Sequence, residues 1–189
     1  PPKPKRSTSC PEGLPEILNR AGGAKHDKSR QRVIDDTFMA NMAAEECMRA
    51  HSEGRGFTLE HPGRSIALHL PSWKKLMSME GVHTIFHHHC RFAPCEKRKY
   101  QVIITNIPQL VDKIGLLCRS SRVCERTGKP HAQWKVQVEG ERVVRFGTAD
   151  TAEYPTGFCE AMAEGYREWL TARGTTKCSH LFVEVFAGK

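Results

Sequence analysis

Apolar residues recur at intervals of three and four between residues 31 and 51, which is the spacing of one face of an α-helix. The centre of this stripe is formed by Ile34, Phe38 and Met42. Further apolar residues widen it on both sides: Val33, Met39, Ala43, Cys47 and Met48. Gly54 can end the helix. We expect a helix over 31–51 that packs this stripe into the core, with its methionines as filler.

Shorter periodic segments alternate between strand-like and helix-like patterns along the rest of the chain. The predicted strands span residues 57–59, 82–88, 100–105, 133–138, 142–146 and 181–186. The predicted helices span residues 71–79, 107–117 and 154–172. Strands that alternate with helices predict an α/β fold. The run from Val102 to Ile104 is apolar on both faces, so its strand should be central in the sheet.

Three of these elements carry apolar faces that we expect to be buried. In the helix over 107–117, Leu110, Ile114 and Leu117 share one face. The helix over 154–172 presents large residues on one side: Phe158, Met162, Tyr166 and Trp169. The strand over 181–186 is apolar on both faces, so we expect it inside the same sheet as the other strands.

The first 30 residues differ in composition from the remainder. They mix Pro, Gly, Ser and Lys with few large apolar side chains and cannot bury enough surface to order themselves unaided. We expect a basic leader or surface loop over 1–30 and one domain over 31–189. A compact turn over 11–15 offers one apolar residue, Leu14, for docking. The missing initial Met indicates a processed product or a fragment.

The chain carries an excess of positive charge. Lys and Arg total 29 against 21 Asp and Glu, which gives a formal net charge of +8 and a pI of about 9.2. This excess favours polyanionic partners such as DNA. No apolar run reaches the roughly 20 residues of a membrane span, and the first residues lack the apolar core of a secretory signal. We therefore expect no membrane association and an intracellular location. A nuclear location is compatible with the sequence.

Eight cysteines raise the question of disulfide or metal chemistry. The chain is too long and too rich in periodic apolar segments to need a disulfide framework, so we expect reduced thiols. Soft ligands gather over 87–90, at Cys95, and in a loop with Cys118, Cys124 and His131. Their spacing matches no standard zinc finger, although they suffice for tetrahedral zinc. A structural zinc site in this loop and buried thiols beside surface histidines stay open as alternatives.

The segment over 56–65 combines a short strand with a proline and a glycine that force a loop. Glu60 follows the predicted strand over 57–59, at the end where open α/β sheets bind ligands. Arg64 and Ser65 follow it, and together the three side chains suit a polar ring or a phosphate. The simpler alternative is a solvated loop acid.

A run of three cations, Lys97, Arg98 and Lys99, directly precedes the strand over 100–105. We expect these side chains at the sheet edge near Glu60, where they would contact the phosphates of a nucleic acid. A solvated turn is the simpler alternative.

Short motifs occur in order along the chain: Glu60-His61-Pro62-x-x-Ser65, Leu70-Pro71, Cys90-x-Phe92, Thr105-Asn106, Cys118, His131 and Tyr154-Pro155-x-x-x-Cys159-x-x-x-Ala163. The upstream segment over 11–14 adds to them, so that they extend from about residue 6 to residue 170. In order and spacing they resemble the carboxyl-terminal half of a divergent group of class I methyltransferases. These are similar to the DNA cytosine-5 methyltransferases of phages and protist retroelements.

The resemblance implies a three-layer Rossmann-like sheet and an S-adenosylmethionine-dependent DNA methyltransferase-like domain. It implies that Glu60 holds the target base and helps to protonate its ring nitrogen. Arg64 and Ser65 would contact the DNA backbone or the base pocket. Tyr154 and Pro155 would open the helix that closes over the methionine part of the cofactor.

Two departures from the family pattern bear on activity. The nucleophilic Pro-Cys motif is absent from this chain, so its status as an enzyme stays open. The last residues, with Glu184, Phe186 and Gly188, resemble the first strand and glycine loop that approach S-adenosylmethionine in the family. That strand comes first in those enzymes and last here, which indicates a circularly permuted fold or a fragment. An ordinary terminal strand is the simpler alternative.

Three functions are compatible with the sequence. The first is a DNA methyltransferase-like domain, active or degenerate, from a retroelement-type polyprotein. The second is a non-catalytic nucleic-acid-binding module that uses Lys74, Lys75 and Arg91 together with residues 97–99. The third is a zinc-stabilised interaction domain.

Overall fold

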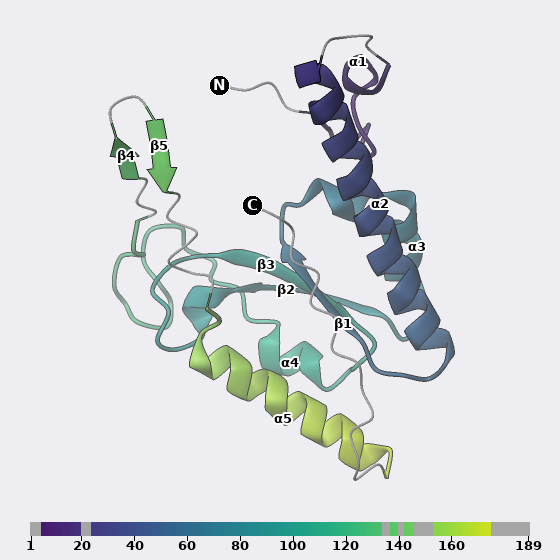
Figure 1. Cartoon of the computed structure of the whole chain (residues 1–189). Helices are drawn as coiled ribbons and strands as arrows, with labels where there is room; N and C mark the ends of the chain where they lie inside the picture. Colours follow the sequence, from purple (N-terminus) through teal and green to yellow (C-terminus); the bar gives the residue numbers. More distant parts are fainter. Residues whose placement is uncertain (1–4, 20–23, 134–136, 140–141, 146–152, 175–189) are drawn as a thin grey trace.

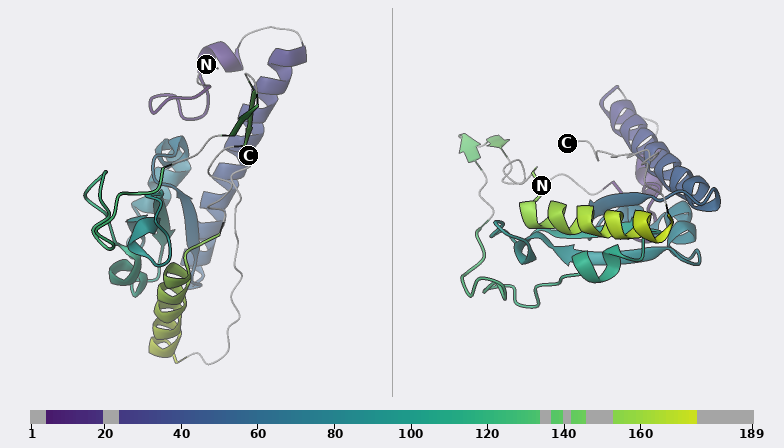
Figure 2. Two further views of the ribbon diagram at one scale, coloured as in Figure 1. Left: turned by 90° about the vertical axis from the view of Figure 1, so that its left-hand side faces the viewer. Right: turned by 90° about the horizontal axis from the view of Figure 1, so that it is seen from below.

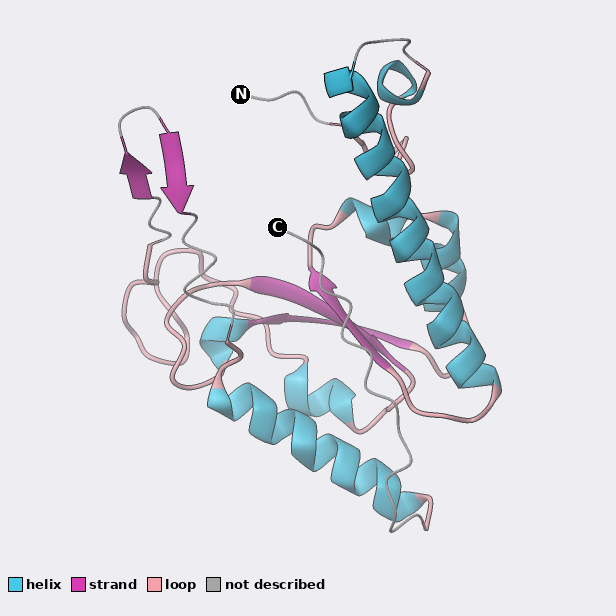
Figure 3. Ribbon diagram, viewed as in Figure 1, coloured by secondary structure: helices cyan, strands magenta, loops and turns pink. Residues whose placement is uncertain are grey.

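A small β-sheet lies between two groups of helices in the computed structural model of the chain (Figures 1 and 3). The structure describes residues 5–19, 24–133, 137–139, 142–145 and 153–174. The mixed α/β class predicted from the alternating patterns is therefore confirmed for these residues.

The sheet has the strands β1 (Thr58–Pro62), β2 (His83–His88) and β3 (Tyr100–Thr105), in the order β1-β3-β2. The central strand β3 is antiparallel to both neighbours, so β1 and β2 are parallel to each other. Its residues Val102, Ile103 and Ile104 are at most 1% exposed, which confirms the prediction of a central strand.

One face of the sheet is covered by α2 (Ala24–Ser52), the short 3-10 helix η1 (Ile66–His69) and α3 (Pro71–Met77) (Figure 3). Their core includes small residues of α2 with larger residues of β1, β3 and α3: Ala43, Ala44, Cys47, Leu59, Trp73, Leu76, Val102 and Ile104. The indole N–H of Trp73 donates to the carbonyl oxygen of Ala40 at 2.9 Å, which fixes α3 against α2.

The other face is covered by α4 (Leu110–Ile114) and α5 (Thr156–Ala172). Their core contains the residues Ile85, Phe92, Ile103, Ile107, Leu110, Ile114, Phe158 and Trp169. Gly165 lets the two helices approach closely, because a Cβ there would lie 2.5 Å from a methyl carbon of Leu110. The prediction for the helix over 154–172 is confirmed, with Phe158 and Trp169 buried.

The amino-terminal residues are tied to α2. After a turn, α1 (Pro15–Leu18) lies beside the amino-terminal half of α2, which extends past the sheet (Figures 1 and 2). Arg6 donates to the carbonyl oxygen of Val33 at 2.5 Å and to the hydroxyl of Thr37 at 2.8 Å. Because α2 begins at Ala24, the boundary expected at residue 30 falls inside a helix.

The position of Glu60 differs from the prediction. β1 continues through Pro62, so Glu60 lies in the middle of a strand and pairs with Ile103. Proline is tolerated there because β1 lies at the edge of this sheet. Because β3 runs opposite to its neighbours, only β1 and β2 share a carboxyl edge, and the all-parallel sheet assumed for the Glu60 site is not present among the described strands.

Two expected apolar faces also differ. Ile34, Phe38 and Met42 point to solvent with 41%, 61% and 46% exposure, because α2 packs through its smaller residues on the opposite side. The helix expected over 107–117 ends at Ile114, where the chain turns so that the Leu116 carbonyl accepts from the N–H of His88. Leu117 is therefore 46% exposed.

The remaining elements are η2 (His89–Arg91) and the antiparallel pair β4 (Gln137–Glu139) and β5 (Arg142–Arg145). Their antiparallel pairing confirms the prediction of two strands in this region. The predicted strand over 181–186, with Glu184, Phe186 and Gly188, lies outside the described residues. None of the described helices is long and apolar enough to span a membrane.

Candidate metal centre

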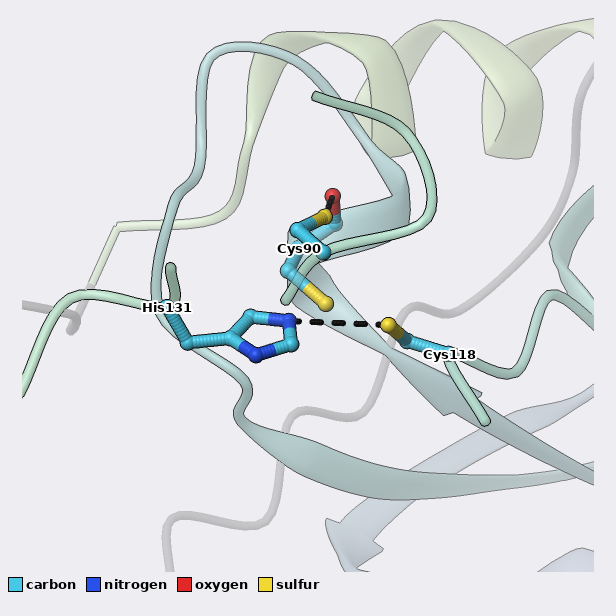
Figure 4. Close-up of side chains that lie close together, drawn as sticks. Cys90, Cys118 and His131 are labelled. Carbon is cyan, nitrogen blue, oxygen red and sulfur yellow. Dashed lines mark hydrogen bonds between the residues drawn. The ribbon is translucent and has the colours of Figure 1, made fainter. Parts of the chain in front are cut away.

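Four soft ligands meet at the end of β2. Cys90 lies in η2, Cys118 follows α4, and Cys124 and His131 come from the loop over 118–131. Their sulfur and nitrogen atoms all lie within 4.8 Å of one another, and each side chain is at most 7% exposed. Figure 4 shows Cys90, Cys118 and His131 converging from separate parts of the chain. The group could hold a metal ion.

The loop folds back on itself so that two ligands lie side by side. The N–H of Cys124 donates to the Lys129 carbonyl at 2.8 Å, and the N–H of His131 donates to the Arg122 carbonyl at 3.0 Å. Gly128 allows the tight turn between them with a φ of +67°. This hairpin-like turn places the Cys124 and His131 side chains together.

Cys118 is positioned by the sheet rather than by its own loop. Its N–H donates to Nδ1 of His88 on β2 at 3.0 Å. The guanidinium group of Arg98, just before β3, donates to its carbonyl oxygen at 2.8 Å. Arg98, which the sequence assigned to phosphate, therefore holds a ligand segment in place.

The spacing of the donor atoms fits tetrahedral zinc. Sulfur at about 2.3 Å and nitrogen at about 2.0–2.1 Å from a tetrahedral ion lie about 3.5 Å apart. The distance from the Cys118 sulfur to Nε2 of His131 is 3.5 Å (Figure 4). No two ligand atoms in the group are more than 4.8 Å apart. A small inward shift of the side chains would therefore bring all four atoms to the corners of a tetrahedron around the ion.

The surroundings of the ligands act differently on each metal-binding form. Nδ1 of His131 lies 3.3 Å from the carbonyl oxygen of Ser121, which leaves Nε2 for the ion when Nδ1 carries the proton. Burial raises the pKa of Cys90, and the thiols of Cys118 and Cys124 raise it further. Burial also raises the pKa of Cys124, but backbone N–H groups donate to its sulfur, and the net pKa is lowered. A divalent cation would stabilise all three thiolates together.

Two charged contacts hold the loop against the rest of the site. Arg126 donates to the carbonyl oxygens of Cys90 and Cys95, each at 2.8 Å. Arg91 and Glu125 form an ion pair at 3.0 Å. Both contacts cross from the loop to the segment after β2, so they brace the ligands without binding the ion.

The histidine run and Cys95 do not join this group. His87 and His89 stack on each other at 5.5 Å and lie against Phe158. Burial lowers the pKa of His87 to about 3 and that of His89 to about 4, so both rings are neutral. Cys95 instead donates to the Lys97 carbonyl at 3.4 Å. The sequence left the fourth ligand open, and the structure selects Cys90 because η2 turns it toward the loop.

Glu60 belongs to a second polar cluster, under α5. Its carboxylate accepts hydrogen bonds from the amide of Gln101 and, at 3.1 Å, from the hydroxyl of Tyr154. The Lys99 ammonium lies 6.0 Å from the centre of the Tyr154 ring. Gln101 pairs with His87 across β2 and β3, so polar side chains cross all three strands on this face. The sequence did not connect Gln101 with Glu60, because only the strand register shows it.

The other expected site residues are dispersed. Ser65 accepts from the N–H of Ala67 as the cap of η1, and it lines a cavity of about 390 Å³ on the α2 side, with His61 and Trp73. Arg64 is exposed, and Pro155 precedes the first turn of α5. The structure thus brings Glu60, Tyr154 and Lys99 together and leaves Ser65 on the opposite face of the sheet.

Comparison with models of known protein families, with curated proteins and with solved structures found no match for this chain.

Proposed function

We propose that the chain is a zinc-stabilised module that binds nucleic acid. The observation that carries this proposal is the convergence of four buried soft ligands within 4.8 Å. Thiolate and imidazole ligands favour zinc among the common divalent ions. Three cysteines and one histidine fill a tetrahedron, which is typical of a structural site and leaves no position for a reacting water.

The nucleic-acid part of the proposal rests on what the centre holds in place. The loop over 118–131 exposes the cations Arg119, Arg122 and Lys129. Its acid Glu125 is paired with Arg91, so it offsets little of the positive charge. Arg98 donates to the carbonyl oxygen of Cys118, the first residue of this loop. This contact joins the basic run over 97–99 to the cations of the loop and extends the basic surface. Cations on a stiffened loop bind phosphates with less loss of conformational entropy than cations on a mobile one.

Two measurements test the proposal. Metal analysis should find about one zinc per chain, and cobalt substitution should give the absorption of a tetrahedral thiolate site. The affinity for a DNA duplex should fall with salt, and the paired changes Arg119→Ala and Arg122→Ala should reduce the slope by about 1 to 2 units. Arg32→Ala with Arg167→Ala, on α2 and α5, is the matched control for charge. A slope that responds equally to both pairs would show that the loop is not the binding surface.

A class I methyltransferase-like role is a second candidate, favoured by the contact between Glu60 and Tyr154. The resemblance assigns Glu60 to the target base and Tyr154 to the start of the cofactor-closing helix, and the Tyr154 hydroxyl donates to the Glu60 carboxylate at 3.1 Å. This contact supports the candidate beyond the order of the sequence motifs.

In that role Glu60 would hold a base by its exocyclic amine, and Gln101 and Tyr154 would orient the carboxylate. S-adenosylmethionine would supply the methyl group. Calorimetry with S-adenosylmethionine on the zinc-loaded chain tests this candidate. If no heat of binding is measured, S-adenosylmethionine is excluded as a cofactor of this chain. The conclusions from the zinc and DNA measurements would be unaffected.

A further inference from the structure

The outer face of α2 carries an unusual group of exposed apolar side chains. Ile34, Phe38 and Met42 are spaced four residues apart and are 41%, 61% and 46% exposed. At 100° per residue they lie within about 40° of Phe38 around the helix. The buried residues Val33 and Cys47 lie on the other side. This face therefore projects away from the core of the described residues.

The residues along the same line are arranged symmetrically about Phe38. Residues equally far before and after Phe38 lie opposite each other when two copies of the helix pair antiparallel about a two-fold axis. Ile34 then faces Met42 of the second copy, and Phe38 faces its own counterpart. Asp27 faces Arg49, which places opposite charges at both ends of the pair.

A second charged pair follows the same register. Arg30 faces Glu46 of the second copy, and Glu46 also pairs with Arg49 of its own helix at 2.5 Å. An antiparallel pair therefore brings Asp27 and Arg30 of each helix beside Glu46 and Arg49 of the other, so that opposite charges alternate. A parallel pair would place like charges together, at a cost in free energy.

We propose that this face of α2 is a homodimer interface, occupied by α2 of a second copy in antiparallel orientation. The contact runs from Asp27 to Arg49, about 33 Å along the helix. Three large apolar side chains per copy make a small interface, at the low end of the range for specific complexes. The dimer should therefore be reversible, with a dissociation constant on the order of micromolar or weaker.

Sedimentation equilibrium on the full, zinc-loaded chain tests the proposal. The wild type should show a reversible monomer–dimer equilibrium, and Phe38→Glu should weaken the dimer at least about tenfold. Circular dichroism checks that the variant remains folded. A monomer at every concentration, or a dimer that Phe38→Glu leaves unchanged, would overturn the proposal.

A charge exchange separates the antiparallel pair from other contacts. Arg30→Glu and Glu46→Arg should each weaken the dimer, because each brings like charges together across the axis. The double variant restores opposite charges and should recover most of the affinity. Failure of this recovery would exclude the antiparallel register. A monomer that Phe38→Glu makes less stable would show that another part of the chain covers the face, which also overturns the proposal.

Discussion

Under the proposed zinc binding, removal of the ion should release the loop over 118–131 and leave the sheet intact. Between residues 119 and 131 the buried side chains are the two ligands Cys124 and His131. The three cysteines of the site, Cys90, Cys118 and Cys124, form a cluster apart from the two cores that flank the sheet. The loop therefore has little apolar packing of its own, and the metal is expected to supply most of its stability.

The size of the effect follows from mass action. Free zinc at about 100 times its dissociation constant stabilises the folded chain by about 2.7 kcal/mol. A domain of this size shifts its midpoint by roughly 2–4 °C for each kcal/mol. Chelation should therefore lower Tm by roughly 5–11 °C.

Hydrogen exchange with mass spectrometry locates the effect. Amides of the loop should lose protection on chelation, and those of β3, which lies between both cores, should keep it. Cys118→Ser should resemble the metal-free chain, whereas Cys159→Ser, at an exposed position on α5, should resemble the wild type. Equal zinc content and equal Tm in these two variants would refute the assigned ligand set.

Two further predictions concern the face under α5. Glu60→Gln replaces one acceptor oxygen by a donor and loses one hydrogen bond, so urea unfolding should show a cost of about 1 kcal/mol. His87→Phe should stabilise the chain, because both His87 ring nitrogens are buried without a hydrogen-bond partner among the described residues. The folded-state pKa of His87 is lowered, so the wild type loses stability as pH falls below about 6.5, and the advantage of Phe should grow by about 1 kcal/mol by pH 5.5.

Controls keep these two predictions specific. A loss well above that value in Glu60→Gln, with DNA affinity unchanged, would assign Glu60 a purely structural role. For His87→Phe the same urea series at saturating zinc cancels the pH dependence of the metal site, which both proteins share. An advantage that stays constant from pH 7.5 to 5.5 would show that His87 does not titrate on unfolding.

The sequence predicts those parts of the fold that depend on local pattern. The apolar run of β3 identifies a strand covered on both sides, and the spacing of Phe158 and Trp169 identifies the buried face of α5. The pattern at Ile34 and Phe38 also predicts a helix, but an apolar stripe does not reveal whether another element covers it. Small residues of α2 allow closer packing than its large ones, and this decides which face turns inward.

The sites depend on long-range geometry and are harder to predict. Cys118, Cys124 and His131 share one loop and could be proposed together, whereas Cys90 joins them only through the turn after β2. Glu60 was expected in a loop because Pro62 usually ends a strand, but edge strands tolerate proline. Strand register then determines its neighbours, and no local pattern encodes that Gln101 and Tyr154 reach it.

The buried imidazoles of His87 and His89 reduce the stability of the face under α5. Apolar side chains at 87 and 89 would pack against Phe158 without burying ring nitrogens that lack partners among the described residues. Folding stability alone therefore does not account for two stacked imidazoles at this position. Buried polar groups that reduce stability are concentrated at functional sites. His87 lies across the strand pairing from Gln101, which donates to Glu60, so the buried imidazoles border the polar cluster that Glu60 forms with Gln101 and Tyr154.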